Sequence, residues 1–242
     1  MLPLQSEYTV EAKGLKKSYG YHQVLADVGF KARRSEHLVI LGANGSGKTT
    51  LINILATICR PSQGKVIIEG LDSRQQAVKI RRKLGVVAHA TMLYSGFTIT
   101  ENLRFYGRMY GVKAIEEKIK ELVLRFDLDR WPSQRVGNLS RGIQQRTAIA
   151  RALVHEPSIL LVDEPETGLD PAALVLLGNV MEELKQRGCT IIATSHNLEF
   201  ALSTGSRLVM LAGGKFVFES ADKALSVDSL RDIFNRYSRN KS

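Results

Sequence analysis

Gly42-Ala-Asn-Gly-Ser-Gly-Lys48-Thr49 is the stretch on which the fold of this chain depends. It matches the G-x-x-x-x-G-K-[ST] pattern of a phosphate-binding P-loop. The apolar run 37–41 before it predicts a buried strand, and the spacing of apolar residues in 49–56 after it predicts a helix packed on a sheet. Because strand, glycine loop and helix follow one another in the required order, a chance glycine-rich turn is the weaker interpretation.

The chemistry of this stretch suits a nucleoside triphosphate. Its glycines let successive backbone N–H groups point inward, and the following helix adds its positive N-terminal end. Lys48 is expected to reach the β- and γ-phosphates, and the Thr49 hydroxyl to bind Mg²⁺. The residues of this stretch expected to bind the nucleotide are Gly42, Ala43, Asn44, Gly45, Ser46, Gly47, Lys48, Thr49 and Thr50.

Length and charge narrow the class of protein. A chain of 242 residues suits one α/β domain, or one domain with an inserted subdomain. The net charge of +10 comes from 34 Lys and Arg against 24 Asp and Glu. These basic residues are scattered and form no motif interleaved with aromatic residues, so we expect no specific nucleic-acid partner and only a modest attraction to acidic lipid headgroups.

Targeting signals and cysteines point to the compartment of synthesis. No apolar run is long enough to span a bilayer, and residues 1–7 lack the basic start and apolar stretch of a signal peptide. Cys59 and Cys189 form no C-x-x-C pair, which indicates a reducing compartment, and the apolar surroundings of Cys189 predict a buried free thiol. We therefore expect the chain to remain where it is made.

The remaining pattern alternates strands and helices. Strands are predicted at 8–15, 24–32, 65–69, 84–88, 158–163, 189–194, 207–211 and 215–219, with a turn at 17–20 and a hairpin through 33–36 that joins the second strand to 37–41. Helices are predicted at 75–83, 141–155, 171–187, 197–203 and 228–237. Between about 100 and 130 the periodicity is helical throughout, which predicts an all-helical insertion.

Polar side chains follow two of these strands. Asp163 and Glu164 end an apolar strand, where a P-loop enzyme needs an acid to hold hydrated Mg²⁺. Asp163 fits that role, and Glu164 is placed to polarise a water against the γ-phosphate. His196 follows the next strand, where it is expected either to hydrogen-bond the γ-phosphate or to orient the water; a partly exposed histidine without function is the alternative.

These motifs together resemble the ATP-binding subunits of ABC transporters over about residues 8–220. The resemblance rests on Tyr19, Gly42 to Thr49, Leu139-Ser-Arg-Gly142, Leu160 to Glu164, Thr167-Gly-Leu-Asp170 and His196. It implies an α/β fold: a P-loop NTPase core with an antiparallel β subdomain and an inserted all-helical subdomain at about 90–140, all within a single domain of residues 1–242.

The resemblance also implies roles for individual residues. Tyr19 would stack on adenine, and Asp170 would lie in a loop that communicates across a dimer. Ser140, Arg141 and Gly142 would form the trans signature, in which Ser140 would offer its hydroxyl and Gly142 a helix N-terminus to the γ-phosphate held by another copy. The cofactors implied are ATP and Mg²⁺. The active unit implied is a homodimer, or a pair with another ATPase subunit, that sandwiches two ATP molecules head to tail.

Two positions depart from the family pattern. The usual signature Leu-Ser-Gly-Gly-Gln is here Leu139-Ser-Arg-Gly-Ile143, so a hydrogen bond from that glutamine is absent. The glutamine that usually follows the strand at 84–88, where it contacts Mg²⁺ and water, is here His89. An imidazole can also donate or accept a hydrogen bond, so our hypothesis is that His89 replaces the glutamine; the alternative is that it makes no metal contact.

The resemblance predicts an ATPase at the cytoplasmic face of a membrane, bound peripherally to an integral membrane permease subunit through the helical insertion and residues 90–97. Within the family, His89 and Leu139-Ser-Arg-Gly142 resemble the ATP-binding subunit of the haem exporter of cytochrome c maturation. Export of a drug, lipid or polysaccharide is the alternative cargo. A soluble ABC ATPase acting on nucleic acid or ribosomes, and a regulator that binds ATP without hydrolysis, are the rival classes.

Overall fold

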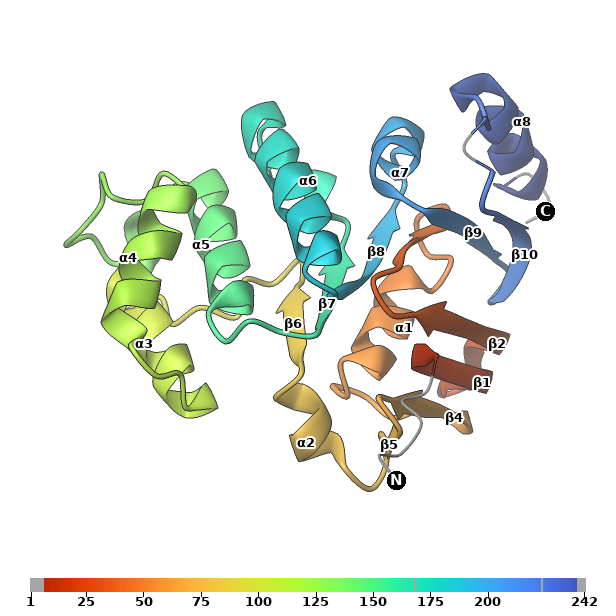
Figure 1. Cartoon of the computed structure of the whole chain (residues 1–242). Helices are drawn as coiled ribbons and strands as arrows, with labels where there is room; N and C mark the ends of the chain where they lie inside the picture. The colour runs from red at the N-terminus through yellow and green to blue at the C-terminus, as the bar shows by residue number, and fades with distance from the viewer. Residues whose placement is uncertain (1–6, 168, 223, 239–242) are drawn as a thin grey trace.

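One mixed sheet runs through the computed structural model, which describes residues 7–167, 169–222 and 224–238 (Figure 1). The described strands lie in the order β5-β4-β1-β2-β10-β9-β3-β8-β7-β6. The strands at the β5 end pair antiparallel, whereas β9, β3, β8, β7 and β6 pair in parallel. The predicted α/β class is therefore confirmed. Residues 1–6, which carry most of the segment inspected for a signal peptide, lie outside the described residues.

The antiparallel part has the strands β1 (Tyr8–Tyr19), β2 (His22–Arg33), β4 (Gln63–Ile68) and β5 (Leu71–Asp72). Val10 of β1 lies opposite Ala32 of β2 and Ile68 of β4, and all three side chains are buried. The predicted turn at 17–20 is wrong by about two residues. The ladder between β1 and β2 continues to the pair Tyr19 and His22, so the chain reverses only after Tyr19.

The parallel part has the strands β3 (His37–Leu41), β6 (Leu84–Val87), β7 (Ile159–Asp163), β8 (Thr190–Ser195) and β9 (Arg207–Ala212). β10 (Lys215–Ser220) pairs antiparallel with β9 and joins this part to β2. Every residue of β3, β7 and β8 is buried, as expected for strands covered on both faces. Parallel strands place their carboxyl ends at one edge of the sheet, so the ends of β3, β7 and β8 meet there.

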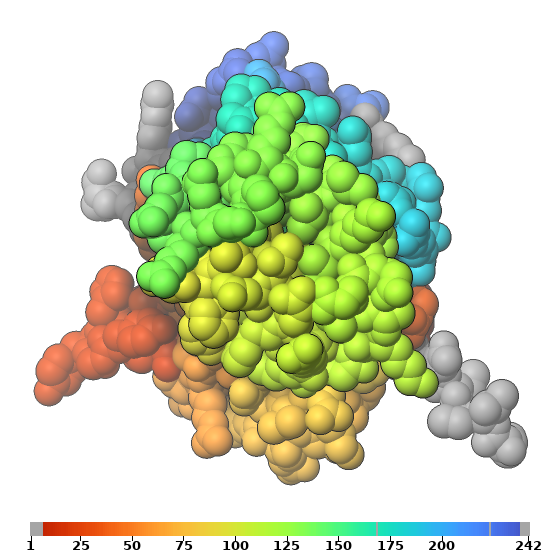
Figure 2. Space-filling model, turned by 90° about the vertical axis from the view of Figure 1, so that its left-hand side faces the viewer, coloured from red at the N-terminus to blue at the C-terminus, as the bar shows by residue number. Residues whose placement is uncertain are grey.

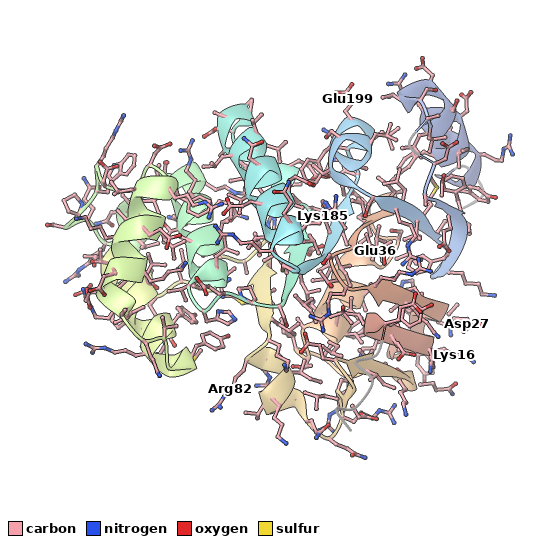
Figure 3. The ribbon with its side chains drawn as sticks, viewed as in Figure 1. Lys16, Asp27, Glu36, Arg82, Lys185 and Glu199 are labelled. Atoms are coloured by element: carbon pink, nitrogen blue, oxygen red, sulfur yellow. The ribbon has the colours of Figure 1, made fainter. Side chains whose placement is uncertain are left out.

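The predicted hairpin between β2 and β3 is wrong. β3 pairs with β8 and β9, and β2 pairs with β1 and β10. The connection at 33–36 instead carries the chain from one part of the sheet to the other. Glu36, labelled in Figure 3, stabilises this turn: its carboxylate accepts a hydrogen bond from the Arg33 N–H at 2.6 Å and lies 2.6 Å from the Arg207 Nε.

Helices cover both faces of the sheet. On one face, α1 (Lys48–Leu55) packs its apolar side against Leu38 and Ile40 of β3. On the other face, α6 (Pro171–Gln186) and α7 (Leu198–Thr204) pack against Val39 and Leu41 of the same strand. α8 (Val227–Ser238) packs near α7, and α2 (Ala77–Arg81) is shorter than predicted because residues 75 and 76 turn back onto the Asp72 carbonyl.

The predicted helical insertion is present at one end of the molecule, where it faces the viewer in yellow and green in Figure 2. It contains α3 (Ile99–Tyr110), α4 (Ile115–Arg125) and the short 3₁₀ helix η1 (Val136–Asn138), and α5 (Arg141–Leu153) follows it. Thr98 is the N-cap of α3: its hydroxyl accepts a hydrogen bond from the Glu101 N–H, and the Glu101 carboxylate accepts one from the Thr98 N–H. Within residues 7–167, 169–222 and 224–238, no helix has the length and hydrophobicity to cross a lipid bilayer.

Candidate functional site

The glycine loop lies between the end of β3 and the start of α1, as predicted. At Gly47, φ is 105°, and a Cβ atom would come within 2.8 Å of the Leu25 side chain, so only glycine fits there. At Gly42, a Cβ atom would lie 2.6 Å from the Leu211 carbonyl oxygen. The backbone of the loop is therefore held close against β2 and β9.

Lys48 is buried at the base of this loop. Its Nζ donates hydrogen bonds to the carbonyls of Gly42 at 2.6 Å and Ala43 at 3.0 Å. The same Nζ lies 2.9 Å from Glu164 Oε1, and the Lys48 side chain is only 2% exposed. The structure thus brings together the two charged residues that the sequence separates by more than a hundred positions.

The two carboxylates after β7 are held by β8. Asp163 lies opposite Thr194 in the register of the two strands, and the Thr194 hydroxyl donates to Asp163 Oδ1 at 2.6 Å. The Glu164 N–H donates to the Thr194 carbonyl at 3.2 Å and its hydroxyl at 3.1 Å. Glu164 has a φ of 45°, which turns its side chain out of the strand direction. Thr194 therefore orients both acids, a role that the sequence analysis missed.

His196 follows β8 and faces two carboxylates. Its Nδ1 lies 3.8 Å from Glu164 Oε2 and 3.3 Å from Glu166 Oε1. Glu166 belongs to the 3₁₀ turn η2 (Pro165–Thr167) that follows the acid pair. The sequence analysis did not single out Glu166, although a third acid two residues beyond an Asp-Glu pair was a signal that could have been used.

Tyr19 ends β1 beside the P-loop helix. Its phenol interacts with the Thr50 hydroxyl in α1 and with the Cys59 thiol. Burial, followed by the proximity of Cys59, raises the pKa of this phenol. The ring is 52% exposed, and the Lys17 Nζ lies 4.7 Å from its centre. An exposed aromatic face next to the loop is compatible with stacking on a base, which remains a prediction.

The donor set at this edge fits Mg²⁺. Thr49 offers a hydroxyl and Asp163 a buried carboxylate, which are hard oxygen ligands. Among the described residues, no group of three or more His, Cys, Asp and Glu side chains forms a cage for a metal ion. Because Mg²⁺ is usually held by one or two protein oxygens together with substrate phosphates and water, two ligands are sufficient.

His89 reaches the same edge from the outermost strand. β6 pairs with β7 so that Val87 lies opposite Val162, and His89 follows two residues later. It is exposed, and its contact with Mg²⁺ remains a prediction.

The His89 hypothesis predicts a change in metal dependence. Replacement of His89 by alanine is expected to raise the Mg²⁺ concentration needed for half-maximal ATPase activity by about tenfold, as for loss of a group that orients a metal site. His89→Gln, which keeps a hydrogen-bonding side chain, should restore the parent value. The Mg²⁺ titrations of the three proteins provide the measurement, and an unchanged curve for His89→Ala would rule the hypothesis out.

The residues of the predicted signature lie apart from the P-loop. Ser140 is the N-cap of α5, where its hydroxyl accepts a hydrogen bond from the Ile143 N–H at 3.5 Å. Ser140 and Arg141 are exposed, and Gly142 is partly exposed. In Figure 1, α5 is grouped with α3 and α4 at the end of the molecule, away from α1. The structure therefore does not bring the signature to the phosphate loop of its own chain.

Asp170 lies beside the signature. It is the N-cap of α6 and accepts a hydrogen bond from the Ala173 N–H at 2.8 Å. A Cβ atom at Gly142 would lie 3.8 Å from Asp170 Oδ2, and the Arg146 guanidinium lies 3.3 Å from that oxygen. The Ala173 hydrogen bond, followed by the pairing with Arg146, lowers the pKa of Asp170. Capping explains this residue locally, and communication across a dimer remains a prediction.

Comparison with known proteins identifies similar chains. Residues 25–167 match the model of a family described as ABC transporter. The chain is 35% identical over 206 residues to the ABC transporter ATP-binding protein NatA of Bacillus subtilis, with 84% of each chain covered. It is 36% identical to the Nod factor export ATP-binding protein I of Rhizobium johnstonii, over 91% of this chain and 71% of the relative. It is 33% identical to the doxorubicin resistance ATP-binding protein DrrA of Mycobacterium tuberculosis, over 90% of this chain and 67% of the relative.

Solved structures agree with this similarity. An ATP-binding subunit of an ABC transporter superposes with a TM-score of 0.87 at 28% identity, covering 94% of this chain and 99% of the other. An ATP-binding cassette solved as a dimer in a post-hydrolysis state bound to ADP and Pi superposes with a TM-score of 0.78 at 30% identity. The superposition covers 87% of this chain and 97% of the other.

Proposed function

The chain belongs to the ABC transporter family of ATP-binding proteins and is an ATPase, and from this premise we propose that it powers an exporter whose membrane-spanning part is a separate permease subunit. ATP hydrolysis, on which the proposal depends, is supported by the meeting of Lys48, Glu164 and His196 at one edge of the sheet, and the exporter is supported by the relatives named above.

ATP hydrolysis follows from the chemistry of these side chains. Lys48 and the N–H groups of the P-loop neutralise the charge that develops on the transferred phosphoryl group. Glu164 positions the attacking water and accepts its proton. This requires the triphosphate to draw Lys48 away from Glu164, which leaves the carboxylate free for water. His196 then contacts the γ-phosphate or the water.

Thr49 and Asp163 are the residues that would hold Mg²⁺, with His89 as a further contact. When bound, the ion supplies positive charge against the β- and γ-phosphates. Thr194 keeps the Asp163 carboxylate oriented toward this edge, and its buried hydrogen bond restricts the rotation of that side chain.

The active unit is a head-to-tail dimer. The exposed N-terminus of α5 is an anion-binding helix start that lies apart from its own P-loop, which supports a role toward the γ-phosphate held by a second copy. The similar cassette that was solved as a dimer with ADP and Pi is consistent with this arrangement.

The permease is expected to dock on the helical insertion. A groove of 530 Å³ there is lined by Phe97, Glu101, Arg104, Phe105, Arg108 and Met109. Phe105 packs edge-on against Tyr94, and Phe97, Phe105 and Met109 all remain at least 39% exposed. An exposed aromatic groove with charged margins is typical of a protein interface, and a helix with an apolar face is the occupant that we propose.

The chemical class of the transported molecule is the most specific part of the proposal. Two of the relatives carry names that refer to Nod factor export and doxorubicin resistance, which supports export of an organic molecule such as a drug, lipid or polysaccharide. The relatives reported above give no support to haem export for cytochrome c maturation, so that hypothesis remains a prediction.

The docking groove gives a direct test of the partner. Phe105→Asp is expected to abolish co-purification of the tagged chain with a polytopic membrane protein from native membranes, because it places a charge in an apolar contact. ATPase activity of the isolated chain should stay at the parent level. Leu124→Asp is the matched control, since Leu124 is 57% exposed on α4 but does not line the groove.

The same experiment separates the rival class. Recovery of a polytopic membrane protein by the parent and by Leu124→Asp, but not by Phe105→Asp, would support the proposal. Recovery of ribosomal proteins or nucleic acid without a membrane partner would contradict it. Binding to DNA or RNA that weakens steeply with salt would point the same way.

A further inference from the structure

Glu166 is a buried acid beside the proposed γ-phosphate contact, and nothing so far assigns it a role. Its side chain is 7% exposed. The Oε1 atom accepts a hydrogen bond from the Ser195 hydroxyl at 2.6 Å and another from the His196 N–H at 3.0 Å. The Nδ1 of the His196 ring lies 3.3 Å from the same oxygen. One carboxylate oxygen therefore contacts both the backbone and the ring of His196.

The second oxygen of Glu166 makes this placement costly. Oε2 is buried and has no hydrogen-bond partner among the described residues. Burying a carboxylate with an unsatisfied oxygen opposes folding, and a neutral side chain would tie η2 to the end of β8 at lower cost. The local fold therefore does not require an acidic side chain at this position.

We infer that Glu166 is a positioning residue that holds the imidazole of His196 with its Nδ1–H toward the carboxylate, so that the lone pair of Nε2 is free to accept a hydrogen bond from the attacking water. This inference rests on the proposed contact of His196 with the reacting groups. A carboxylate only accepts hydrogen bonds, so it selects the ring form that carries a proton on Nδ1. The other nitrogen, Nε2, then has a lone pair that can accept a hydrogen bond from the attacking water.

Glu164 cannot supply this orientation. Its Oε2 is 3.8 Å from His196 Nδ1, beyond hydrogen-bond distance, and its Oε1 is paired with Lys48 at 2.9 Å. Glu164 is also the residue that must turn toward water during hydrolysis. Glu166 sits in a short turn that the Thr167 hydroxyl closes onto the Glu164 carbonyl at 2.8 Å. It can therefore keep the ring in place while Glu164 changes partners.

The first experiment reads the proton on the ring directly. With ¹⁵N-labelled histidine in the full chain, nitrogen NMR resolves the ring nitrogens of five histidines, and the His196→Ala variant identifies those of His196. In the neutral ring of the parent, we expect the proton on Nδ1. In Glu166→Gln it should shift toward Nε2, because an amide can turn its NH₂ group toward Nδ1. A parent ring with its proton on Nε2 would overturn the inference without any variant.

The second experiment measures turnover. Glu166→Gln is expected to lower kcat by about ten- to a hundredfold with little change in KM. This decrease in kcat is smaller than that expected when a group that stabilises the transition state is removed altogether. In the His196→Ala background the same substitution should change kcat by less than about twofold, because Glu166 acts through His196. Ser195→Ala, which removes another contact of Glu166 but keeps the carboxylate, is the control for a purely structural role and should retain more activity than Glu166→Gln.

The outcomes separate the inference from the proposed function. If His196→Ala loses turnover but Glu166→Gln keeps it, the inference about Glu166 fails and the site stands. If His196→Ala keeps full turnover, the proposed role of His196 fails first. If Glu166→Gln lowers kcat equally in both backgrounds, Glu166 acts independently of the ring. Unchanged circular dichroism and melting temperature establish that each variant is folded.

Discussion

Lys48→Met is expected to abolish ATP binding at concentrations that saturate the parent. The Lys48 ammonium is the buried cation of the P-loop, and methionine replaces its stem without its charge or its donors. Removing one partner of a buried, hydrogen-bonded charge pair costs about 2 to 5 kcal/mol, which corresponds to a roughly 30- to 5,000-fold weaker Kd. Calorimetric titration with ATP measures it, and ATPase activity should fall with binding.

The control for Lys48→Met is Lys65→Ala, which removes an exposed lysine of β4. Its Kd should match that of the parent. A thermal shift gives a second measurement, because ATP stabilises the folded state only of a protein that binds it. If Lys48→Met bound ATP within about threefold of the parent, a difference of less than 1 kcal/mol, the assignment of the P-loop would be wrong.

The P-loop was predictable because its determinants are local. A buried strand, glycines at fixed spacing, a lysine and a helix lie within about twenty residues, so no long-range contact was needed to recognise them. Ser140 and Asp170 are helix N-caps in the structure, and such caps also depend on short-range patterns, although the sequence analysis gave Asp170 only a role in communication across a dimer.

The β2–β3 connection shows where local patterns fail. A four-residue link between two strands favours a hairpin, yet all five residues of β3 are buried and therefore belong inside a sheet covered on both faces. β10 takes the place beside β2 that the hairpin would have given to β3. This choice depends on β8, β9 and β10, which lie more than 140 residues away in the sequence.

Thr194 and Glu166 were missed for a related reason. Threonine in a strand and glutamate in a turn are ordinary residues, and their meaning arises only from partners on a neighbouring element. Thr194 acts because the register of β7 and β8 places it opposite Asp163, and Glu166 because η2 lies against the end of β8. No periodicity in the sequence encodes either register or the packing of a turn.

Glu164→Gln is expected to form a stable dimer with ATP while losing almost all turnover. Glutamine keeps the shape of the side chain but cannot accept the proton of the attacking water, and loss of a general base costs about 10²- to 10⁴-fold. The substitution also removes the carboxylate that lies 2.9 Å from Lys48. Lys48 is then free to bind phosphate without competition, so ATP should bind at least as tightly as in the parent.

Light scattering during gel filtration with ATP measures the dimer, and phosphate release measures turnover. Glu199→Gln is the matched control, because Glu199 is an exposed acid on α7 that Figure 3 labels at the margin of the molecule. It should hydrolyse ATP like the parent. Undiminished hydrolysis by Glu164→Gln would remove Glu164 from the role of base. If Glu164→Gln binds ATP without turnover but stays monomeric, Glu164 keeps its role as base but the head-to-tail dimer is contradicted. ATP that is not hydrolysed should hold two copies together in a stable dimer.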